Sequence, residues 1–173
     1  TPANDVFSTI PVGAGDMGLN YNYGERPPAG ATVKTGQTAT IGYWNNKNGQ
    51  ALLRSLNGAP TATNLGDWLA DSFPHMYGAM SNNNLAGKSN DYIANFYQTT
   101  RFSVKGQKLD AQVMGVAFAV FVTNTNLNTG SGQSVAIGQG FTLSSDGLGA
   151  STMNVGSYGA AFGVPNNTTM RVI

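Results

Sequence analysis

The chain has no cysteine, so its fold contains neither disulfide bonds nor thiolate metal ligands. It also has a single histidine, His75, which is too few for the nitrogen and sulfur ligands of a usual zinc site. Charged residues make up only 10% of the 173 residues, and the formal net charge is +1. Nucleic-acid binding requires clustered cations, and no cluster of lysine and arginine is present. We therefore predict no nucleic-acid partner, no metal and no cofactor.

Long hydrophobic runs are also missing. The most apolar stretch, residues 113–122, has about half the length of a membrane-spanning helix and instead indicates a buried helix. Hydrophobic residues still make up 40% of the chain and aromatic residues 10%, which is enough for a folded core. Uncharged Asn, Gly, Thr and Ser dominate the rest, which favours an extracellular or cell-surface protein. The chain starts at Thr1 rather than methionine, and we interpret it as a mature or excised segment.

The first 28 residues are predicted to form a β arm. Apolar residues alternate with polar ones on both sides of the glycine-rich segment 13–18, which is typical of a β-hairpin. Pro27 and Pro28 then remove two backbone donors and mark a boundary. We therefore predict an arm over residues 1–28 and a globular domain over residues 29–173. The apolar face of the arm consists of Val6, Phe7, Ile10, Val12, Leu19, Tyr21 and Tyr23.

The globular domain is predicted to be α+β, with antiparallel strands packed against about four helices. Leucine and aromatic residues recur at helical spacing in four stretches. These stretches are residues 52–56, 64–73, 89–97 and 109–121. The last one is apolar on nearly every side, with Leu109 and Val116 in its stripe, which predicts a central core helix.

Several strands are predicted as well. Residues 38–43 alternate as a half-buried strand does, and four shorter stretches lie between glycine-rich turns. The short stretches centre on Val135 and Ile137, Phe141 and Leu143, Met153 and Val155, and Met170 and Val172. The final stretch, Thr169–Ile173, also fits the start of a helix.

The arm suggests a function. A two-stranded hairpin is marginally stable alone, so it must pack on its own domain or on another copy. Addition to a neighbour's sheet gives a head-to-tail homopolymer when the geometry does not close. Both arrangements remain open at this stage. We predict a non-enzymatic structural subunit that self-assembles through its arm into an extracellular filament or sheath.

Aromatic residues support an alternative, a carbohydrate-binding or adhesive module of a cell-surface protein. Trp44 and Trp68, together with Tyr43 and Tyr77, are side chains of the kind that stack on sugar rings. Glycans are also expected on the chain itself. Residues 166–169 contain two overlapping N-x-[ST] acceptors, which predicts glycosylation at Asn166 and Asn167.

Three further motifs have structural interpretations that we favour. The glycines at 13–18 match G-x-G-x-x-G, but a strand rather than a helix is expected after them, so a hairpin turn is predicted. Asp67 and Asp71 share a helix face and, with His75, would suit a hydrolase; Asp67 equally suits the positive start of a helix. Asp146 begins a glycine-rich stretch that lacks the alternating acids of a calcium loop.

The segment Leu19–Glu25 resembles the closing strand of the B-type repeats of Gram-positive adhesins and serine-aspartate repeat proteins, which end in a Tyr-Asn-aromatic-Gly-Glu phrase. Short sequence motifs within residues 37–168 resemble those of a domain that follows such repeats in very large bacterial surface proteins. These motifs are residues 41–50, 65–70, 108–113 and 159–164. The resemblance implies a surface location, a structural or adhesive role and no catalytic residues. Only the end of a repeat is present, so its core and any Lys–Asn crosslink cannot be carried over.

Overall fold

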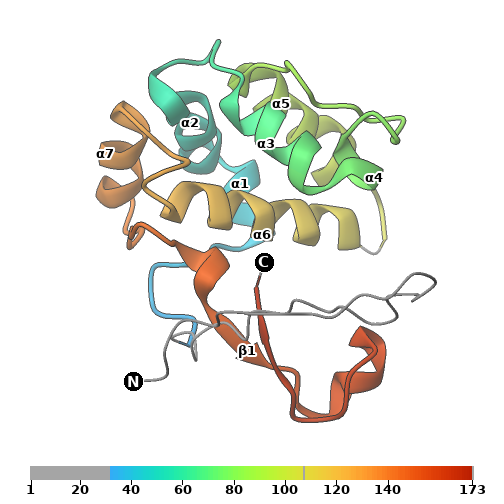
Figure 1. Cartoon of the computed structure of the whole chain (residues 1–173). Coiled ribbons are helices and arrows are strands. Elements are labelled where there is room, and N and C mark those ends of the chain that lie inside the picture. Colours follow the sequence, from blue (N-terminus) through green and yellow to red (C-terminus); the bar gives the residue numbers. More distant parts are fainter. Residues whose placement is uncertain (1–31, 107, 173) are drawn as a thin grey trace, which may run out of the picture.

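The computed structural model describes residues 32–106 and 108–172. This part of the chain forms seven α helices with α6 at the centre, and a two-stranded antiparallel ribbon lies on one side of them (Figure 1). The predicted mixture of helices with a small antiparallel sheet is confirmed, with more helices than expected. The predicted arm, its boundary and its apolar face lie outside the described residues. That face is Val6, Phe7, Ile10, Val12, Leu19, Tyr21 and Tyr23.

The helices follow one another with short connections. They are α1 (Ile41–Asn45), α2 (Lys47–Ser55), α3 (Asn64–Ser72), α4 (Pro74–Tyr77), α5 (Asn90–Phe96), α6 (Leu109–Thr123) and α7 (Ser131–Gly138). Three predicted helices, α2, α3 and α5, are confirmed, and Ser89 caps α5 by accepting a hydrogen bond from the backbone N–H of Tyr92. Within the described residues no helix combines the length and the hydropathy that crossing a bilayer requires.

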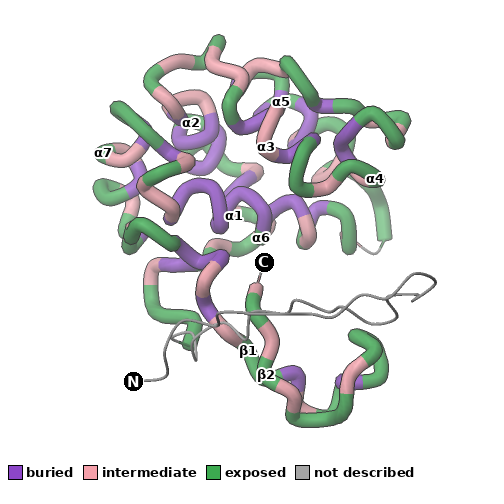
Figure 2. Tube along the Cα trace, viewed as in Figure 1, coloured by how far each residue is buried: buried purple, intermediate pink, exposed green. Residues whose placement is uncertain are grey.

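Helix α6 is the core helix that its composition predicts. Ten of its fifteen residues are buried, and Figure 2 shows this helix among the most buried parts of the chain. Gly115 lets the indole of Trp44 pack directly against the helix backbone, because a Cβ atom there would lie 3.1 Å from Trp44 Cδ1. The predicted apolar stripe is wrong at two positions. Leu109 and Val116 are exposed, since they face away from the helices that cover α6.

Two predicted strands are helices instead. Residues 38–43 alternate in polarity, yet the Thr40 side chain accepts a hydrogen bond from the Tyr43 N–H and starts α1. Val135 and Ile137 lie in α7 rather than in a strand. Short apolar runs fit a helix or a strand equally well, and packing decides between them. The stretch around Phe141 forms no strand either; Ser144 makes a single bridge with Asn124.

The two remaining strand predictions are confirmed. Strand β1 (Thr152–Asn154) pairs with β2 (Thr169–Arg171), and Met153 lies opposite Met170. A 3-10 turn over Gly156–Phe162 lies between the strands, and another over Leu148–Ala150 leads into β1. Thr32 forms an isolated parallel bridge with Thr152 on the other edge of β1.

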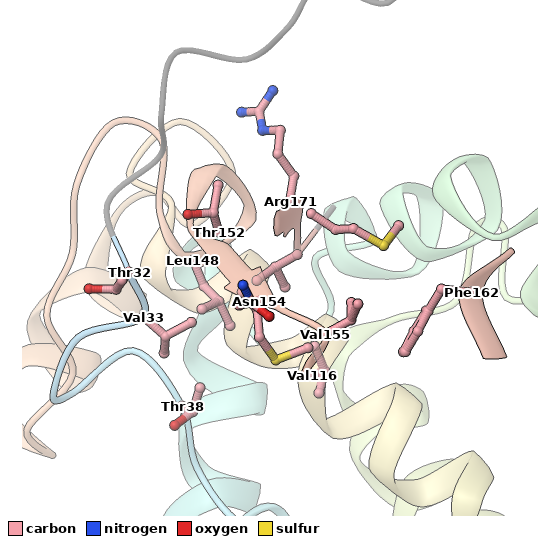
Figure 3. Close-up of a pocket in the computed structure, with 13 residues that line it drawn as sticks. Thr32, Val33, Thr38, Val116, Leu148, Thr152, Asn154, Val155, Phe162 and Arg171 are labelled. Carbon is pink, nitrogen blue, oxygen red and sulfur yellow. The ribbon is translucent and has the colours of Figure 1, made fainter. Parts of the chain in front are cut away.

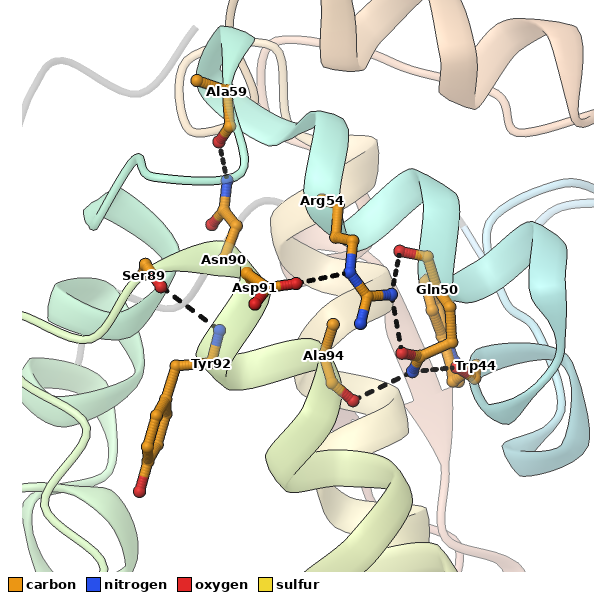
Figure 4. Close-up of polar contacts among 9 residues, drawn as sticks. All are labelled: Trp44, Gln50, Arg54, Ala59, Ser89, Asn90, Asp91, Tyr92 and Ala94. Atoms are coloured by element: carbon orange, nitrogen blue, oxygen red, sulfur yellow. Dashed lines mark hydrogen bonds and ion pairs between the residues drawn. The ribbon is translucent and has the colours of Figure 1, made fainter.

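A buried amide ties three helices together (Figure 4). The Nε2 atom of Gln50 in α2 donates to the backbone oxygens of Trp44 in α1 and Ala94 in α5, each at 3.0 Å. Its Oε1 atom accepts from Arg54 Nη1 at 3.0 Å, and Arg54 Nε donates to Asp91 Oδ1 at 2.7 Å. Because these partners lie on separate helices, the amide fixes how α1, α2 and α5 sit around the core.

Candidate binding groove

An apolar groove of about 690 Å³ lies between α6 and the β1–β2 ribbon (Figure 3). Val116 of α6 lines it on one side, and Leu148 and Val155, which precede and follow β1, line it as well. Thr32 and Val33, where the described chain begins, line the groove as well. The groove is larger than two other hollows among the described residues, which have volumes of about 150 and 280 Å³.

Large apolar side chains remain exposed around this groove. Their relative exposures are 38% for Val33, 45% for Val116, 52% for Phe162 and 53% for Met153. Single exposed apolar residues are ordinary, but a contiguous patch of this kind marks an interaction surface. Covering the remaining exposed surface of each side chain is worth roughly 1 kcal/mol. The groove is therefore suited to an apolar, extended occupant.

Charge contributes little to the groove. Among the described residues that line it, Arg171 is the only one with an ionisable side chain, and it lies at the rim. Its guanidinium points away from the apolar side chains (Figure 3). Thr38, Thr152 and Asn154 supply the uncharged polar groups. A ligand that needs a charged partner finds none inside the groove.

The groove borders a sheet edge. Successive residues of an antiparallel strand direct their backbone N–H and C=O groups to alternate sides. Thr152 bridges to Thr32 on the side of β1 away from β2, so Asn154 directs its backbone groups to the same side. Within residues 32–106 and 108–172, no further strand continues this edge beside Asn154. Exposed backbone groups next to an apolar surface form the usual acceptor for an added strand.

The two tryptophans predicted to stack on sugars differ in the fold. Trp44 has no exposed surface, which corrects its proposed role, because neither ring face is open to a ligand. Tyr77 is likewise buried. Trp68 is only partly buried and lines a smaller hollow at the ends of α3 and α6. Of this pair, Trp68 alone keeps the accessibility that a sugar requires.

Asp67 has a structural role in the fold. Its Oδ1 atom accepts from the Gly87 N–H at 2.6 Å, and its Oδ2 atom accepts from Thr63 Oγ1 at 2.9 Å. The carboxylate therefore holds the loop at Gly87 against the start of α3. His75 and Asp71 are exposed on α4 and α3. The described residues contain no group of three or more His, Cys, Asp and Glu side chains arranged to hold a metal.

The predicted glycosylation sites lie in the loop before β2. Asn166 and Asn167 are both exposed, and Asn167 has a left-handed backbone with φ of 61°. Asn166 Oδ1 accepts from the Gly159 N–H at 3.2 Å. Both side chains are accessible to a modifying enzyme, and glycosylation stays a prediction.

The tyrosines of the core have altered acidity. Burial raises the pKa of Tyr77 to about 12, and the nearby Arg101 opposes this shift in pKa. Burial likewise raises the pKa of Tyr43 to about 12, and that of Tyr97 further still. These groups line no part of the apolar groove. They are neutral hydroxyls at physiological pH and serve packing, as Tyr97 does by donating to the Ile41 backbone oxygen at 3.1 Å.

Comparison of the chain with protein-family models, curated proteins and solved structures gave no match. The groove was not predicted from the sequence, although Met153 and Met170 were placed in strands. A signal for the groove is nevertheless present in the sequence. Each of the two short strands has a methionine between polar residues, so each strand has one apolar face, and such a face indicates a surface that is covered by a partner.

Proposed function

We propose that the chain is a structural subunit of an extracellular filament or sheath. In this proposal the N-terminal segment of one copy enters the groove of a neighbouring copy and adds a strand beside β1. The observation that carries the proposal is the apolar groove next to an extendable sheet edge. Apolar side chains of the added strand would fill the groove, while its backbone would pair with the edge at Asn154.

The alternation of apolar and polar residues over 19–23 makes this segment the proposed donor strand. Leu19, Tyr21 and Tyr23 alternate with Asn20 and Asn22, which gives an extended strand one apolar face and one polar face. Such a face matches a groove that is apolar within and polar at its backbone edge. The opposite face would remain in water, where asparagine is well solvated.

Donation to a neighbour is favoured over donation to the same domain. Pro27 and Pro28 lie between the donor segment and Thr32, and consecutive prolines favour an extended backbone. A spacer that stays extended would let the donor reach a neighbouring copy. Each copy then offers one donor and one acceptor, which is a heterologous contact, and repeated contacts of this kind give an open polymer.

The ribbon itself gives a physical reason for assembly. Each of its strands has three residues, and a two-stranded ribbon is stable only with further support. Packing of Leu148 and Val155 toward α6 supplies part of that support. An added strand would supply the remainder by covering Met153 and Val116, so assembly and folding of the ribbon would stabilise each other.

The test uses two full-length variants of the same helix. Val116→Asp places a charge in the groove, and Leu109→Asp places one at an exposed apolar position of α6 that does not line the groove. Because both positions are exposed, both chains should fold with little loss of stability. We expect filaments or large oligomers from wild type and Leu109→Asp, and monomers from Val116→Asp, by sedimentation velocity and negative-stain microscopy.

Two results would contradict the proposal. One is a Val116→Asp chain that assembles as wild type does. The other is a wild-type chain that remains monomeric at every concentration, since the groove would then have no occupant from a second copy. Circular dichroism of both variants shows whether the fold is retained.

A further inference from the structure

A second hollow, of about 280 Å³, lies on the side of the domain where α3 and α6 end. It is lined by Trp68 and Ser72 of α3, by the end of α6, by the loop at Asp146 and by Arg171 of β2. We propose that this hollow binds a neutral saccharide, with Trp68 contacting the apolar face of a sugar ring. The inference does not require assembly, because the hollow shares only Arg171 with the apolar groove.

The indole of Trp68 is held in place by other rings. Phe73 and Phe121 pack against it edge to face, with centroid separations of 5.9 Å and 5.5 Å. An aromatic ring that is fixed in this way loses little conformational freedom when a ligand stacks on it. Aromatic side chains that are partly exposed provide the apolar contact that C–H groups of a pyranose ring need.

Two charged side chains face the same hollow without engaging each other. Asp146 and Arg171 are both exposed, and neither side chain makes a hydrogen bond or ion pair with any described residue. A carboxylate accepts hydrogen bonds from sugar hydroxyls, and a guanidinium donates to them. Since their charges cancel, the hollow favours a neutral polyhydroxylated ligand over an anion. Ser72 adds a hydroxyl group at the end of α3.

The wall that carries Asp146 is rigidly built. Gly147 has φ of 59°, and a Cβ atom there would lie 2.8 Å from the backbone nitrogen of Asn124, so only glycine fits. The Gly147 N–H donates to Ser144 Oγ at 2.9 Å, and the Leu148 N–H donates to Thr123 Oγ1 at 2.8 Å. These bonds fix the loop against the end of α6. The backbone that carries Asp146 is therefore fixed at the edge of the hollow before any ligand arrives.

The size of the hollow limits the ligand. A volume of about 280 Å³ is at the lower end for small-molecule sites and suits one or two sugar rings. With one aromatic contact and a few hydrogen bonds, the expected dissociation constant is on the order of 1 mM. Such weak binding is useful where many copies present the site together, because multivalency multiplies the affinity.

The two tryptophans make a direct test possible. A nitrogen–proton NMR spectrum of the full chain contains one indole signal from Trp68 and one from Trp44, which is fully buried. The probes are the neutral tetrasaccharides of cellulose, chitin and mannan, with an oligogalacturonate as the anionic comparison, each at up to about 10 mM. We expect at least one neutral tetrasaccharide to shift the Trp68 signal saturably and to leave the Trp44 signal in place. If assembly broadens the spectrum, the same titration is made on Val116→Asp, whose substitution lies outside the hollow.

Matched variants locate the site. Asp146→Ala should weaken the titration at least tenfold, whereas Asp71→Ala, an exposed acid of α3 that does not line the hollow, should leave it unchanged. The inference is overturned if no neutral tetrasaccharide moves the Trp68 signal, if only the anionic one does, or if the two variants titrate alike. A failed titration leaves the assembly result unaffected, since Asp146 does not line the apolar groove.

Discussion

Thr32 pairs with Thr152 in a parallel bridge, so the described chain begins at the edge of β1 that borders the apolar groove. After the bridge the chain passes Val33, which also lines the groove, and then turns away at Lys34, whose backbone oxygen accepts from the Gln37 N–H at 3.2 Å. The place where the N-terminal segment joins the domain and the place proposed to receive such a segment are therefore neighbours. In a polymer, the point where a copy's own N-terminal segment leaves its domain would therefore lie close to the groove that receives the segment of the next copy.

The loop at Gly147 should tolerate no side chain. We expect Gly147→Ala to destabilise the fold by about 3–4 kcal/mol, because a Cβ atom would meet the backbone of Asn124 in addition to straining a left-handed backbone. The matched control is Gly156→Ala, which has a similar φ of 56° and open space around it. That variant should lose only about 1–2 kcal/mol. Chemical denaturation of both chains measures the difference, and equal losses would refute the predicted close approach.

The buried amide of Gln50 should contribute more to the free energy of unfolding than the neighbouring ion pair between Arg54 and Asp91. Gln50→Leu leaves the backbone oxygens of Trp44 and Ala94 without their buried donor, so we expect a loss of about 2–3 kcal/mol in the free energy of unfolding. Asp91→Asn removes only a partly exposed ion pair with Arg54, which should cost at most about 1 kcal/mol. Urea titrations of the two variants check the order, and a larger loss in Asp91→Asn would contradict it.

The buried tyrosines predict instability at high pH. Tyr43 and Tyr77 have pKa values near 12 in the fold and 10.0 when unfolded, so the folded chain binds more protons above pH 10. Stability should be independent of these groups below pH 10 and fall as the pH rises from 10 toward 12. Each tyrosine should contribute at most about 1.4 kcal/mol per pH unit to the slope, and the partly exposed Tyr43 should contribute less than Tyr77. Replacing Tyr43 with Phe should reduce this slope; an unchanged slope would argue against burial as its cause.

Native material should carry glycans near β2. Asn166 and Asn167 are exposed acceptors, so we expect peptide mass spectrometry of the protein from its source to show added sugar on the peptide that contains them. Fragmentation should place the addition in residues 166–167. A peptide with only the unmodified mass would rule out this modification.

The sequence predicts some parts of this fold well and others poorly, for physical reasons. Helix α6 was predictable because a long apolar stretch has few other solutions, and the ribbon was predictable from Met153 and Met170 between turn residues. The conformation of residues 38–43 was not predictable. Their polarity alternates as in a strand, but the side chain of Thr40 caps a helix that starts at Ile41. The α6 side of the groove is not predictable from the sequence, since Val116 is apolar like its neighbours and only packing leaves it exposed.

The candidate site residues also differ in how well the sequence predicts their surroundings. Residue type alone suggests sugar stacking at both tryptophans; Trp68 is partly buried, so the prediction stays open there, whereas Trp44 is fully buried. The sequence gives Asp146 only as the start of a glycine-rich stretch. In the fold, Asp146 and Trp68 line the same hollow, because Gly147 lets this loop pack against the backbone of Asn124. Residue spacing in the sequence does not predict this tertiary contact.

The central claim is that the N-terminal segment fills the groove of another copy, and a disulfide tests it most directly. The chain has no cysteine, so the variant Tyr21→Cys with Met153→Cys carries one thiol in the donor segment and one in the exposed groove. A disulfide forms only where the two Cα atoms come within about 7 Å. After mild oxidation, a non-reducing gel should show a ladder of linked multimers, while Tyr21→Cys with Ile137→Cys should remain monomeric. A monomer with an internal disulfide, or no disulfide at all, would contradict the claim.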